Sequence, residues 1–262
     1  MKKWIAMLSL TVMALSGTAQ AADWAGKEIR LAVDPTYPPL EYKTPDGKLA
    51  GFGIDMTNAL CAQMRAHCVW VENSFDGMIP GLLARKFDVI ASSMTITPKR
   101  MEQIAFTNKM SNTPAQLVVR RGSPLVPTAA SLKGKRVGVQ QGTSQEDYAR
   151  ALWQPAGVQI VSYQDQDQVY TDLVSGRLDA AFQAAIAASE GFLKKPQGKD
   201  FMSAGQSILD PKYFGQGDGL GLRKEDVALR EAFNQALAAI LANGTYARIN
   251  NKYFDFDAYG GK

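Results

Sequence analysis

Polar residues that could bind a carboxylate follow predicted strands at two places in this sequence. Ser92, Ser93 and Thr95 supply hydroxyl groups, and Arg100 follows them in the first turn of a predicted helix. A guanidinium in that position can bind a carboxylate through two parallel hydrogen bonds. Residues 142–144 precede a second predicted helix, and backbone N–H groups at a helix start favour an anion. Each group alone fits ordinary helix capping, but together, on opposite walls of a cleft, the two predict a carboxylate site.

A second set of residues could bind a cation. Asp34 directly follows a predicted strand, and Tyr37 and Phe75 are aromatic residues expected to lie near it. A carboxylate flanked by rings suits a charge on an aliphatic stem, because the charge pairs with the acid while the methylene groups lie against the rings. The alternative is that both rings are ordinary core aromatics. The two sets predict a small ligand with a carboxylate at one end and a cation at the other.

Alternating strand and helix patterns indicate an α/β protein that can bring these residues together. The predicted strands cover 29–33, 69–71, 87–91, 135–139, 158–161 and 178–182, and the predicted helices cover 52–64, 78–84, 148–153 and 169–175. In open α/β sheets, ligands bind beyond the carboxyl ends of the strands. The segments at those ends are 34–37, 92–95, 140–145 and 183–185.

An internal echo suggests two lobes of related plan. Residues 85–90 and 176–181 each follow a predicted helix and lead into a strand, and their sequences are alike. The glycine run at 215–221 has neither the dinucleotide-binding spacing nor that of a P-loop. It predicts a crossing strand or hinge where backbones approach closely.

The first 21 residues have the three parts of a secretory signal. A short basic start leads into an apolar run that is too short to span a bilayer, and Ala19-Gln20-Ala21 fits a cleavage site before Ala22. Removal of residues 1–21 would take away two lysines and no acids, lowering the net charge from +4 to +2. So small an excess argues against a nucleic-acid partner. No later segment is long and apolar enough to cross a membrane, so the mature chain is not expected to be membrane-embedded.

Cys61 and Cys68 are the only cysteines. In an oxidising compartment, two cysteines this close predict one local disulfide. A metal site is the alternative because His67 lies beside Cys68, but two thiols and one imidazole are too few ligands for a closed zinc site. We therefore expect no metal, no cofactor and, since His67 is the only histidine, no Ser-His-Asp catalytic set.

Short motifs spread along the chain after the signal carry a resemblance to a known family. They are DPTYPP at 34–39, SFD at 74–76, SSMTIT at 92–97, LKGK at 132–135, QGTSQE at 141–146, GRLDAA at 176–181, ASEGFL at 188–193 and KYFDF at 252–256. In these motifs, and in its two cysteines, the sequence resembles the periplasmic lysine/arginine/ornithine-binding and histidine-binding proteins. These are family 3 solute-binding proteins of polar amino acid ABC importers.

The resemblance implies a two-lobe periplasmic-binding-protein-like type II (Venus flytrap) fold. Each lobe would have a central β-sheet flanked by helices, and two crossing hinge strands would lie near 112–115 and 209–217. Lobe 1 is then discontinuous, with residues 22–112 and 214–262, and lobe 2 is 113–213.

The resemblance also implies roles for single residues. Arg100, Thr95 and Ser144 would hold the ligand carboxylate, and Asp34 with Ser92 would bind the side-chain cation. Tyr37 and Phe75 would enclose the stem, while the backbone of Ser93 and the hydroxyl of Thr95 would help to hold the α-ammonium. The predicted substrate-binding set is completed by Gln140, Thr143, Gln145 and Ala184.

Two positions depart from the family pattern. Those relatives carry an aspartate that pairs with the ligand α-ammonium where this chain has Ala184, and an apolar residue where it has Gln140. Loss of one partner of a desolvated charge pair weakens binding by several kcal/mol. An ordinary basic amino acid would therefore bind poorly unless water or Gln183 compensates. Three ligand classes stay open: a basic amino acid held in a rearranged way, a derivative without the α-amine such as 4-guanidinobutyrate, or an opine.

The sequence therefore predicts a monomeric periplasmic protein that captures a small cationic amino acid of the arginine, lysine, ornithine and histidine class, or a derivative of one. Cleft closure would present the ligand to an inner-membrane ABC permease with its ATPase. An enzyme like the cyclohexadienyl dehydratases is a remote alternative. A receptor that feeds a sensor is another, since fold and pocket would be the same.

Overall fold

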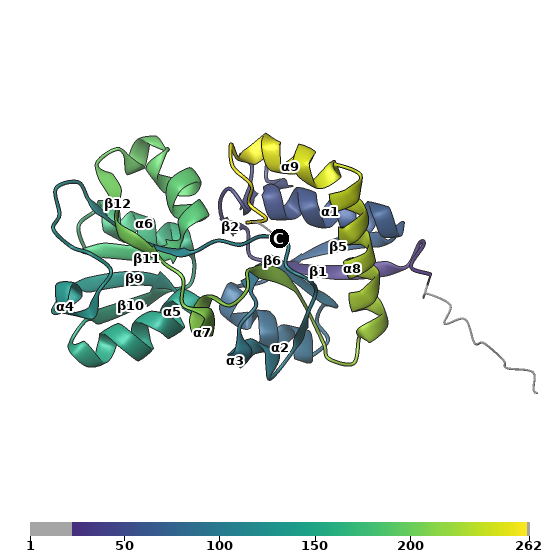
Figure 1. Ribbon diagram of the computed structural model, residues 1–262, viewed down its shortest axis with the longest axis horizontal. Coiled ribbons are helices and arrows are strands. Elements are labelled where there is room, and N and C mark those ends of the chain that lie inside the picture. The colour runs from purple at the N-terminus through teal and green to yellow at the C-terminus, as the bar shows by residue number, and fades with distance from the viewer. Residues whose placement is uncertain (1–22, 261–262) are drawn as a thin grey trace, which may run out of the picture.

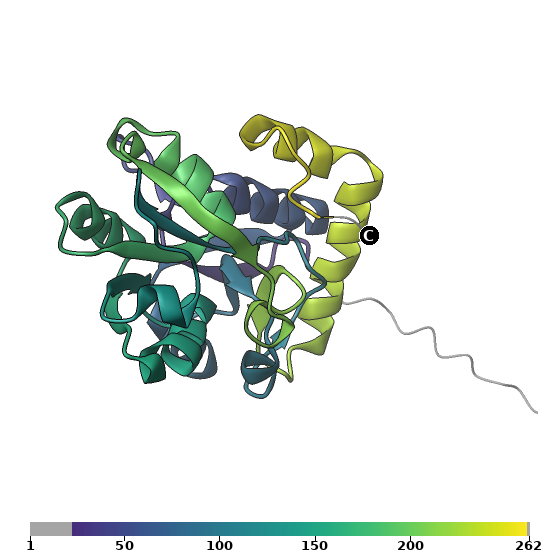
Figure 2. The same ribbon diagram turned by 60° about the vertical axis from the view of Figure 1, so that its left-hand side comes forward.

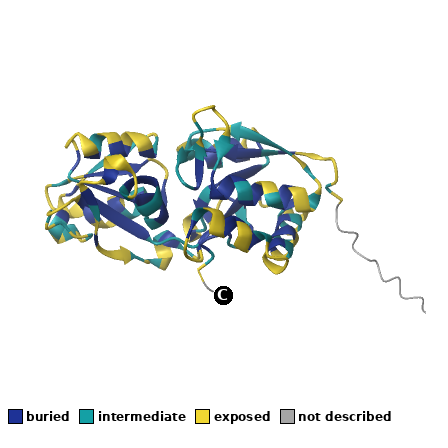
Figure 3. Ribbon diagram, turned by 90° about the horizontal axis from the view of Figure 1, so that it is seen from above, coloured by how far each residue is buried: buried dark blue, intermediate teal, exposed yellow. Residues whose placement is uncertain are grey.

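The computed structural model describes residues 23–260, so the predicted signal peptide lies outside the described residues. The described chain folds into two lobes, each built around its own sheet, with two segments passing between them (Figure 1). Strands lie buried inside each lobe, and exposed residues gather on the outer faces of the helices (Figure 3). This is the two-lobe α/β architecture that the sequence predicted.

The sheet of lobe 1 has the strand order β5-β1-β6-β13-β7. Its strands are β1 (Glu28–Val33), β5 (His67–Glu72), β6 (Val89–Thr95), β7 (Ala105–Phe106) and β13 (Asp218–Leu222). Strand β1 runs parallel to β5 and β6, whereas β13 is antiparallel to β6 and β7. The carboxyl ends of β1 and β6 therefore meet at one edge. A small antiparallel sheet of β2 (Thr36–Tyr37), β3 (Glu41–Lys43) and β4 (Leu49–Ala50) follows β1 in the chain.

Helices cover both faces of this sheet. They are α1 (Phe52–Met64), the 3-10 turn η1 (Phe75–Gly77), α2 (Met78–Leu83), α3 (Pro98–Met101), α8 (Val227–Ala242) and α9 (Thr245–Tyr253). The C-terminal helices α8 and α9 pack against α1 on the outer side of the lobe (Figures 1 and 2). Leu31 of β1, Met56 of α1 and Phe233 of α8 are fully buried in the core that these helices share with the sheet. Burial of each such side chain stabilises the lobe by about 1.5–3 kcal/mol.

Lobe 2 repeats the plan with the strand order β10-β9-β11-β8-β12. Its strands are β8 (Ala115–Arg120), β9 (Arg136–Gln140), β10 (Gln159–Tyr163), β11 (Ala180–Ala184) and β12 (Phe201–Ile208). Strand β9 is parallel to β10 and β11, so the ends of β9 and β11 deliver Gln140 and Ala184 to one edge. The helical segments are α4 (Ala129–Leu132), α5 (Ser144–Tyr148), η2 (Ala149–Trp153), η3 (Gln154–Ala156), α6 (Gln166–Val174), η4 (Ala187–Leu193) and η5 (Pro196–Gly198).

The sequence echo corresponds to one structural device used in both lobes. Asp88 accepts a hydrogen bond from the backbone N–H of Arg30 at 3.1 Å, and Asp179 accepts one from the backbone N–H of Arg136 at 2.8 Å. In each case the acid that precedes one parallel strand ties it to its neighbour.

One predicted helix was wrong in its extent. The segment predicted at 148–153 starts at Ser144, and its second half, η2, is a π-helical turn. Thr143 caps the start by accepting a hydrogen bond from the Glu146 backbone N–H at 3.1 Å.

The two segments that connect the lobes pair with each other. Ser111 and Asp218 form an antiparallel bridge at the lobe 1 end, and Ala115 pairs with Ile208 at the lobe 2 end. The second connection is not a plain strand as predicted, because it contains the helical turn α7 (Pro211–Phe214). Phe214, which the predicted boundary assigned to lobe 1, packs with its ring 5.3 Å from that of Tyr148 in lobe 2. The predicted lobe boundaries otherwise stay a prediction.

The glycine run of the second connection allows the close backbone approach that was predicted. A Cβ at Gly215 would lie 1.6 Å from the carbonyl oxygen of Ile96, and one at Gly217 would lie 2.3 Å from that of Ser111. Both glycines also have positive φ angles, of 56° and 108°.

The predicted disulfide between Cys61 and Cys68 is present and joins the end region of α1 to β5. We expect the variant Cys61→Ala/Cys68→Ala to unfold with a free energy about 2.5 kcal/mol below that of the wild type, because the unfolded chain loses a constraint. Urea unfolding with and without reductant measures this. A variant as stable as the oxidised wild type would contradict the prediction.

Within residues 23–260, no helix combines the length and apolar character needed to cross a membrane.

Candidate functional site

A cavity lies between the lobes where the carboxyl ends of β1, β6, β9 and β11 face one another. The space among its lining atoms is about 500 Å³ when the solvent at its mouth is included. Its lining contains all of the residues predicted to bind substrate: Asp34, Tyr37, Phe75, Ser92, Ser93, Thr95, Arg100, Gln140, Thr143, Ser144, Gln145 and Ala184. Their shared position is observed, whereas their individual roles stay predictions.

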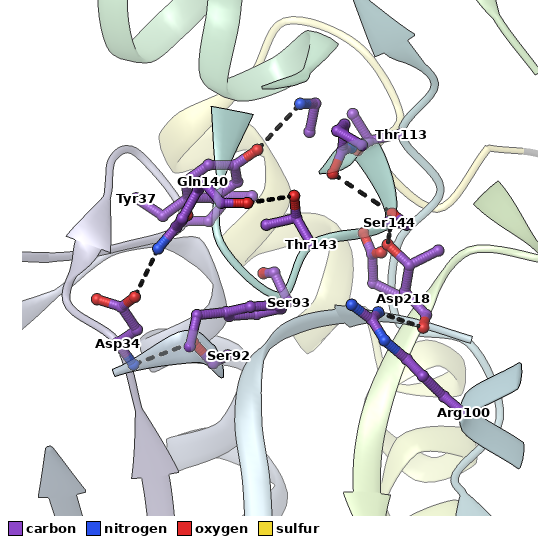
Figure 4. A pocket seen from close by; sticks show the side chains of 15 residues that line it. Asp34, Tyr37, Ser92, Ser93, Arg100, Thr113, Gln140, Thr143, Ser144 and Asp218 are labelled. Carbon is purple, nitrogen blue, oxygen red and sulfur yellow. Dashed lines mark hydrogen bonds between the residues drawn. The ribbon is translucent and has the colours of Figure 1, made fainter. Parts of the chain in front are cut away.

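Asp34 forms one end of the cavity (Figure 4). Its carboxylate accepts hydrogen bonds from the Thr36 hydroxyl at 2.8 Å and from Gln140 Nε2 at 2.7 Å, and the side chain is 4% exposed. Burial raises the pKa of Asp34, while the bonds from Thr36 and Gln140 oppose that rise. Gln140, the second departure from the family pattern, thus holds the acid from across the cleft. The Phe75 backbone N–H also donates to this carboxylate, and its two oxygens together retain capacity for a further donor.

Arg100 lies on the other side of the cavity, at the start of α3 (Figure 4). Thr97 caps this helix and Pro98 occupies its first position. The Arg100 guanidinium donates to the carbonyl oxygens of Thr95 at 2.7 Å and Gly142 at 3.0 Å. Burial lowers the pKa of Arg100 to about 10, so the side chain stays charged at neutral pH.

Tyr37 and Phe75 line the cavity as predicted, and each also has a protein contact. The Tyr37 hydroxyl accepts a hydrogen bond at 2.9 Å from the backbone N–H of Ala184 in the opposite lobe. The Phe75 ring lies 5.6 Å from the guanidinium carbon of Arg100. The rings therefore belong to the cleft rather than to either core alone.

The hydroxyl residues of β6 are held in different ways. Ser92 accepts a hydrogen bond from the Asp34 backbone N–H at 3.0 Å. Ser93 has a positive φ of 40°, which is strained for a residue with a side chain, and donates to Glu41 at 2.7 Å. Strain of this kind concentrates at functional sites.

The lobe 2 wall is polar and uncharged. Ser144 donates to the Thr95 hydroxyl at 3.5 Å across the cleft. The Thr143 hydroxyl donates to the Gln140 carbonyl at 2.7 Å in addition to capping α5. The backbone N–H groups here are less free for an anion than predicted, because that of Gly142 donates to Glu146 at 2.7 Å.

The idea that Gln183 compensates for Ala184 was wrong. Gln183 points to the other side of β11 from Ala184 because strand side chains alternate, and it is not among the residues that line the cavity. It is 1% exposed.

Three lining residues were missed from the sequence: Leu40, Thr113 and Asp218. The Thr113 hydroxyl is buried without a hydrogen-bond partner in the described part of the protein. Asp218 lies inside the glycine run, which was considered only for its backbone. Its charge in an otherwise apolar and glycine-rich strand was the signal that could have revealed it.

Direct contacts hold the lobes together around the cavity. Besides the bonds from Gln140, Arg100 and Ala184, Lys99 pairs with Asp147 at 2.9 Å. A Cβ at Gly191 of lobe 2 would lie 2.2 Å from the Pro38 carbonyl oxygen of lobe 1. Within residues 23–260, no group of His, Cys, Asp and Glu side chains is arranged to hold a metal ion.

Comparison with known proteins places this geometry in context. The model of the bacterial extracellular solute-binding proteins, family 3, matches residues 29–256. The histidine-binding periplasmic protein of Escherichia coli K12 is 52% identical over 100% of both chains. The lysine/arginine/ornithine-binding periplasmic protein of the same strain is 50% identical over 99% of this chain and 100% of its own.

A solved structure shows the same fold. It is a periplasmic binding protein of Salmonella typhimurium, described as having high arginine specificity, with a TM-score of 0.81 and 34% identity. The match covers 87% of this chain and 100% of the other.

Proposed function

The chain belongs to the bacterial extracellular solute-binding proteins, family 3, and we propose that it captures a cationic amino acid in the periplasm for an ABC importer. One observation carries the ligand class: a buried carboxylate, Asp34, and a buried guanidinium, Arg100, lie on opposite sides of one cavity. An extended molecule with a cation at one end and a carboxylate at the other satisfies both. The relatives that bind histidine, lysine, arginine and ornithine support the same class.

In the proposed complex, the ligand carboxylate lies against Arg100 and the hydroxyls of Thr95 and Ser144. The side-chain cation pairs with Asp34 near Ser92, and the aliphatic stem lies between Tyr37 and Phe75. Gln140 orients the Asp34 carboxylate, and Thr143 fixes the turn that carries Ser144 and Gln145. The planar guanidinium of Arg100 suits a carboxylate better than a lysine ammonium at this position would, because two parallel N–H groups match the two carboxylate oxygens.

Closure of the lobes is the working step of the proposed function. The paired segments at Ser111–Asp218 and Ala115–Ile208 can act as the hinge, while the ligand contacts both walls of the cleft. A ligand that binds the closed form better than the open form shifts the population toward it. The closed form would present both lobes at once to the permease, with the protein acting as a monomer.

We propose a binding role without catalysis. The relatives at 50–52% identity are binding proteins. His67, the only histidine, lies exposed at the start of β5 and not among the cavity residues.

A ligand screen tests this proposal. Thermal shifts of the mature protein, followed by calorimetry, would compare arginine, lysine, ornithine and histidine with agmatine, 4-guanidinobutyrate, octopine and nopaline. A ligand at a hundredfold excess over its Kd stabilises the native state by about 2.7 kcal/mol. We expect clear shifts from the basic amino acids and none from agmatine, which has no carboxylate for Arg100. If none of the four amino acids shifts the melting temperature, the proposed function is overturned.

A further inference from the structure

Asp218 is a buried acid of the cavity that none of the roles above uses. It begins β13, pairs with Thr95 of β6 in the sheet, and is 8% exposed. Its carboxylate accepts a hydrogen bond from the Ser111 hydroxyl at 3.1 Å and interacts with the Thr95 side chain. Burial raises the pKa of Asp218 to about 6, so the group is still ionised at pH 7.

Asp218 lies at the same end of the cavity as Arg100. Both contact Thr95: the Asp218 carboxylate interacts with the Thr95 side chain, and the Arg100 guanidinium donates to the Thr95 carbonyl oxygen. Figure 4 shows Asp218 and Arg100 beside each other. The two groups attract each other at a distance, but among the described residues neither forms a direct ion pair, with N and O atoms within 4.0 Å. Two buried opposite charges, each without a direct ionic partner, therefore face one small volume.

A buried charge without an ionic partner is costly, and a ligand that supplies the partner recovers that cost. The head group of an amino acid carries an ammonium and a carboxylate on the same carbon. It matches a carboxylate and a guanidinium held next to each other in the protein.

Among residues 23–260, no other acid is placed to take the ammonium. The lining residues of lobe 2 carry no charge, and Ala184 offers only a methyl group. Asp34 lies on the far side of the cavity with Gln140. Glu41 accepts from Ser93 behind the cavity and does not line it, and burial raises its pKa to about 8, so it is protonated at neutral pH.

The charges of the lining residues can then be matched with those of a ligand. In their ionised forms, Asp34 and Asp218 contribute two negative charges, and Arg100 contributes one positive charge. Arginine, lysine and ornithine carry the complementary set of two cations and one carboxylate. A derivative without the α-amine leaves Asp218 unpaired, and an opine adds a carboxylate for which the cavity has no second cation.

We propose that Asp218 binds the α-ammonium of the ligand, and that the ligand is an unmodified basic amino acid. This inference rests on the proposed function and narrows its ligand class. Asp218 also lies in the segment that joins the lobes, so the same contact links occupancy of the cavity to the hinge.

The test compares wild type with Asp218→Asn by calorimetry, using L-arginine and 4-guanidinobutyrate, which differ in the α-amine. Asparagine keeps an acceptor for Ser111 and the backbone pairing of β13 but has no charge. Loss of one member of a buried charge pair predicts a Kd for L-arginine about 30-fold or more weaker. The Kd for 4-guanidinobutyrate, measured directly or by displacement, should not weaken by more than about threefold, because no ammonium faces residue 218 and the variant removes an unpaired negative charge.

Two variants serve as controls. Asp46→Asn removes an exposed acid of the same lobe and should leave both Kd values unchanged. If Asp218→Asn unfolds at a lower temperature than wild type, Asp218→Thr provides a second uncharged residue that suits a strand.

The outcomes separate the two proposals. An arginine Kd within about threefold of wild type in Asp218→Asn, or equal weakening of both ligands, overturns the assignment of Asp218. So does a wild type that binds 4-guanidinobutyrate as tightly as arginine. A wild type that binds none of arginine, lysine, ornithine and histidine overturns the proposed function itself.

Discussion

Arginine binding is expected to weaken by at least about 100-fold when Arg100 is replaced by glutamine, which keeps the polarity but not the charge. The ligand carboxylate would then be buried without a cation. The loss corresponds to about 3–5 kcal/mol, typical for one partner removed from a buried pair. Calorimetry with L-arginine measures the change.

Arg100→Lys is the matched control for this prediction. Lysine restores the charge but not the two parallel N–H groups, so its affinity should lie between those of the wild type and Arg100→Gln. The melting temperature without ligand reports any loss of the bonds to Thr95 and Gly142. An Arg100→Gln variant that binds arginine like the wild type would show that the carboxylate binds elsewhere.

The second large effect is expected at the other end of the cavity. Asp34→Asn should weaken arginine binding by about 30-fold or more, because the side-chain cation loses its ionic partner while Thr36 and Gln140 stay in place. Citrulline, a neutral molecule of nearly the same shape as arginine, provides the comparison. Its Kd should change little, so the preference of the wild type for arginine over citrulline should largely disappear in the variant.

A uniform loss for both ligands would contradict this assignment. It would indicate that Asp34 shapes the cavity and does not pair with a cation. Unchanged arginine binding would place the cation against another group.

Much of the fold followed from local patterns. The helix at 52–64 was predicted with the bounds that α1 has, because apolar spacing over a long segment is a strong signal. The similar segments 85–90 and 176–181, which contain Asp88 and Asp179, predicted two lobes with the same arrangement of strands and helices. The predicted strand 87–91 was shifted, since β6 extends to Thr95 and carries the polar residues of the site within the strand itself.

Residue types and family likeness determined much of the site as well. Asp34, Tyr37, Phe75 and Arg100 follow strands, and the hydroxyl residues lie at or just beyond strand ends, at an edge where the carboxyl ends must meet in such a fold. The sequence also identified the missing acid at Ala184 and the polar residue at Gln140. It did not show which contacts these two residues make, because Gln140 and Ala184 both bond to residues of the opposite lobe.

Only the tertiary structure decided those contacts. Gln140 reaches Asp34 over a sequence separation of 106 residues, and Asp218 reaches Ser111 over 107. Secondary-structure patterns report which face of a strand is buried, but not which distant strand lies opposite. Asp218 is a binding residue because β13 returns from lobe 2 to pair with β6, which places its carboxylate beside Thr95 and Arg100. Such a position depends on how the chain crosses between the lobes, and no local pattern in the sequence encodes it.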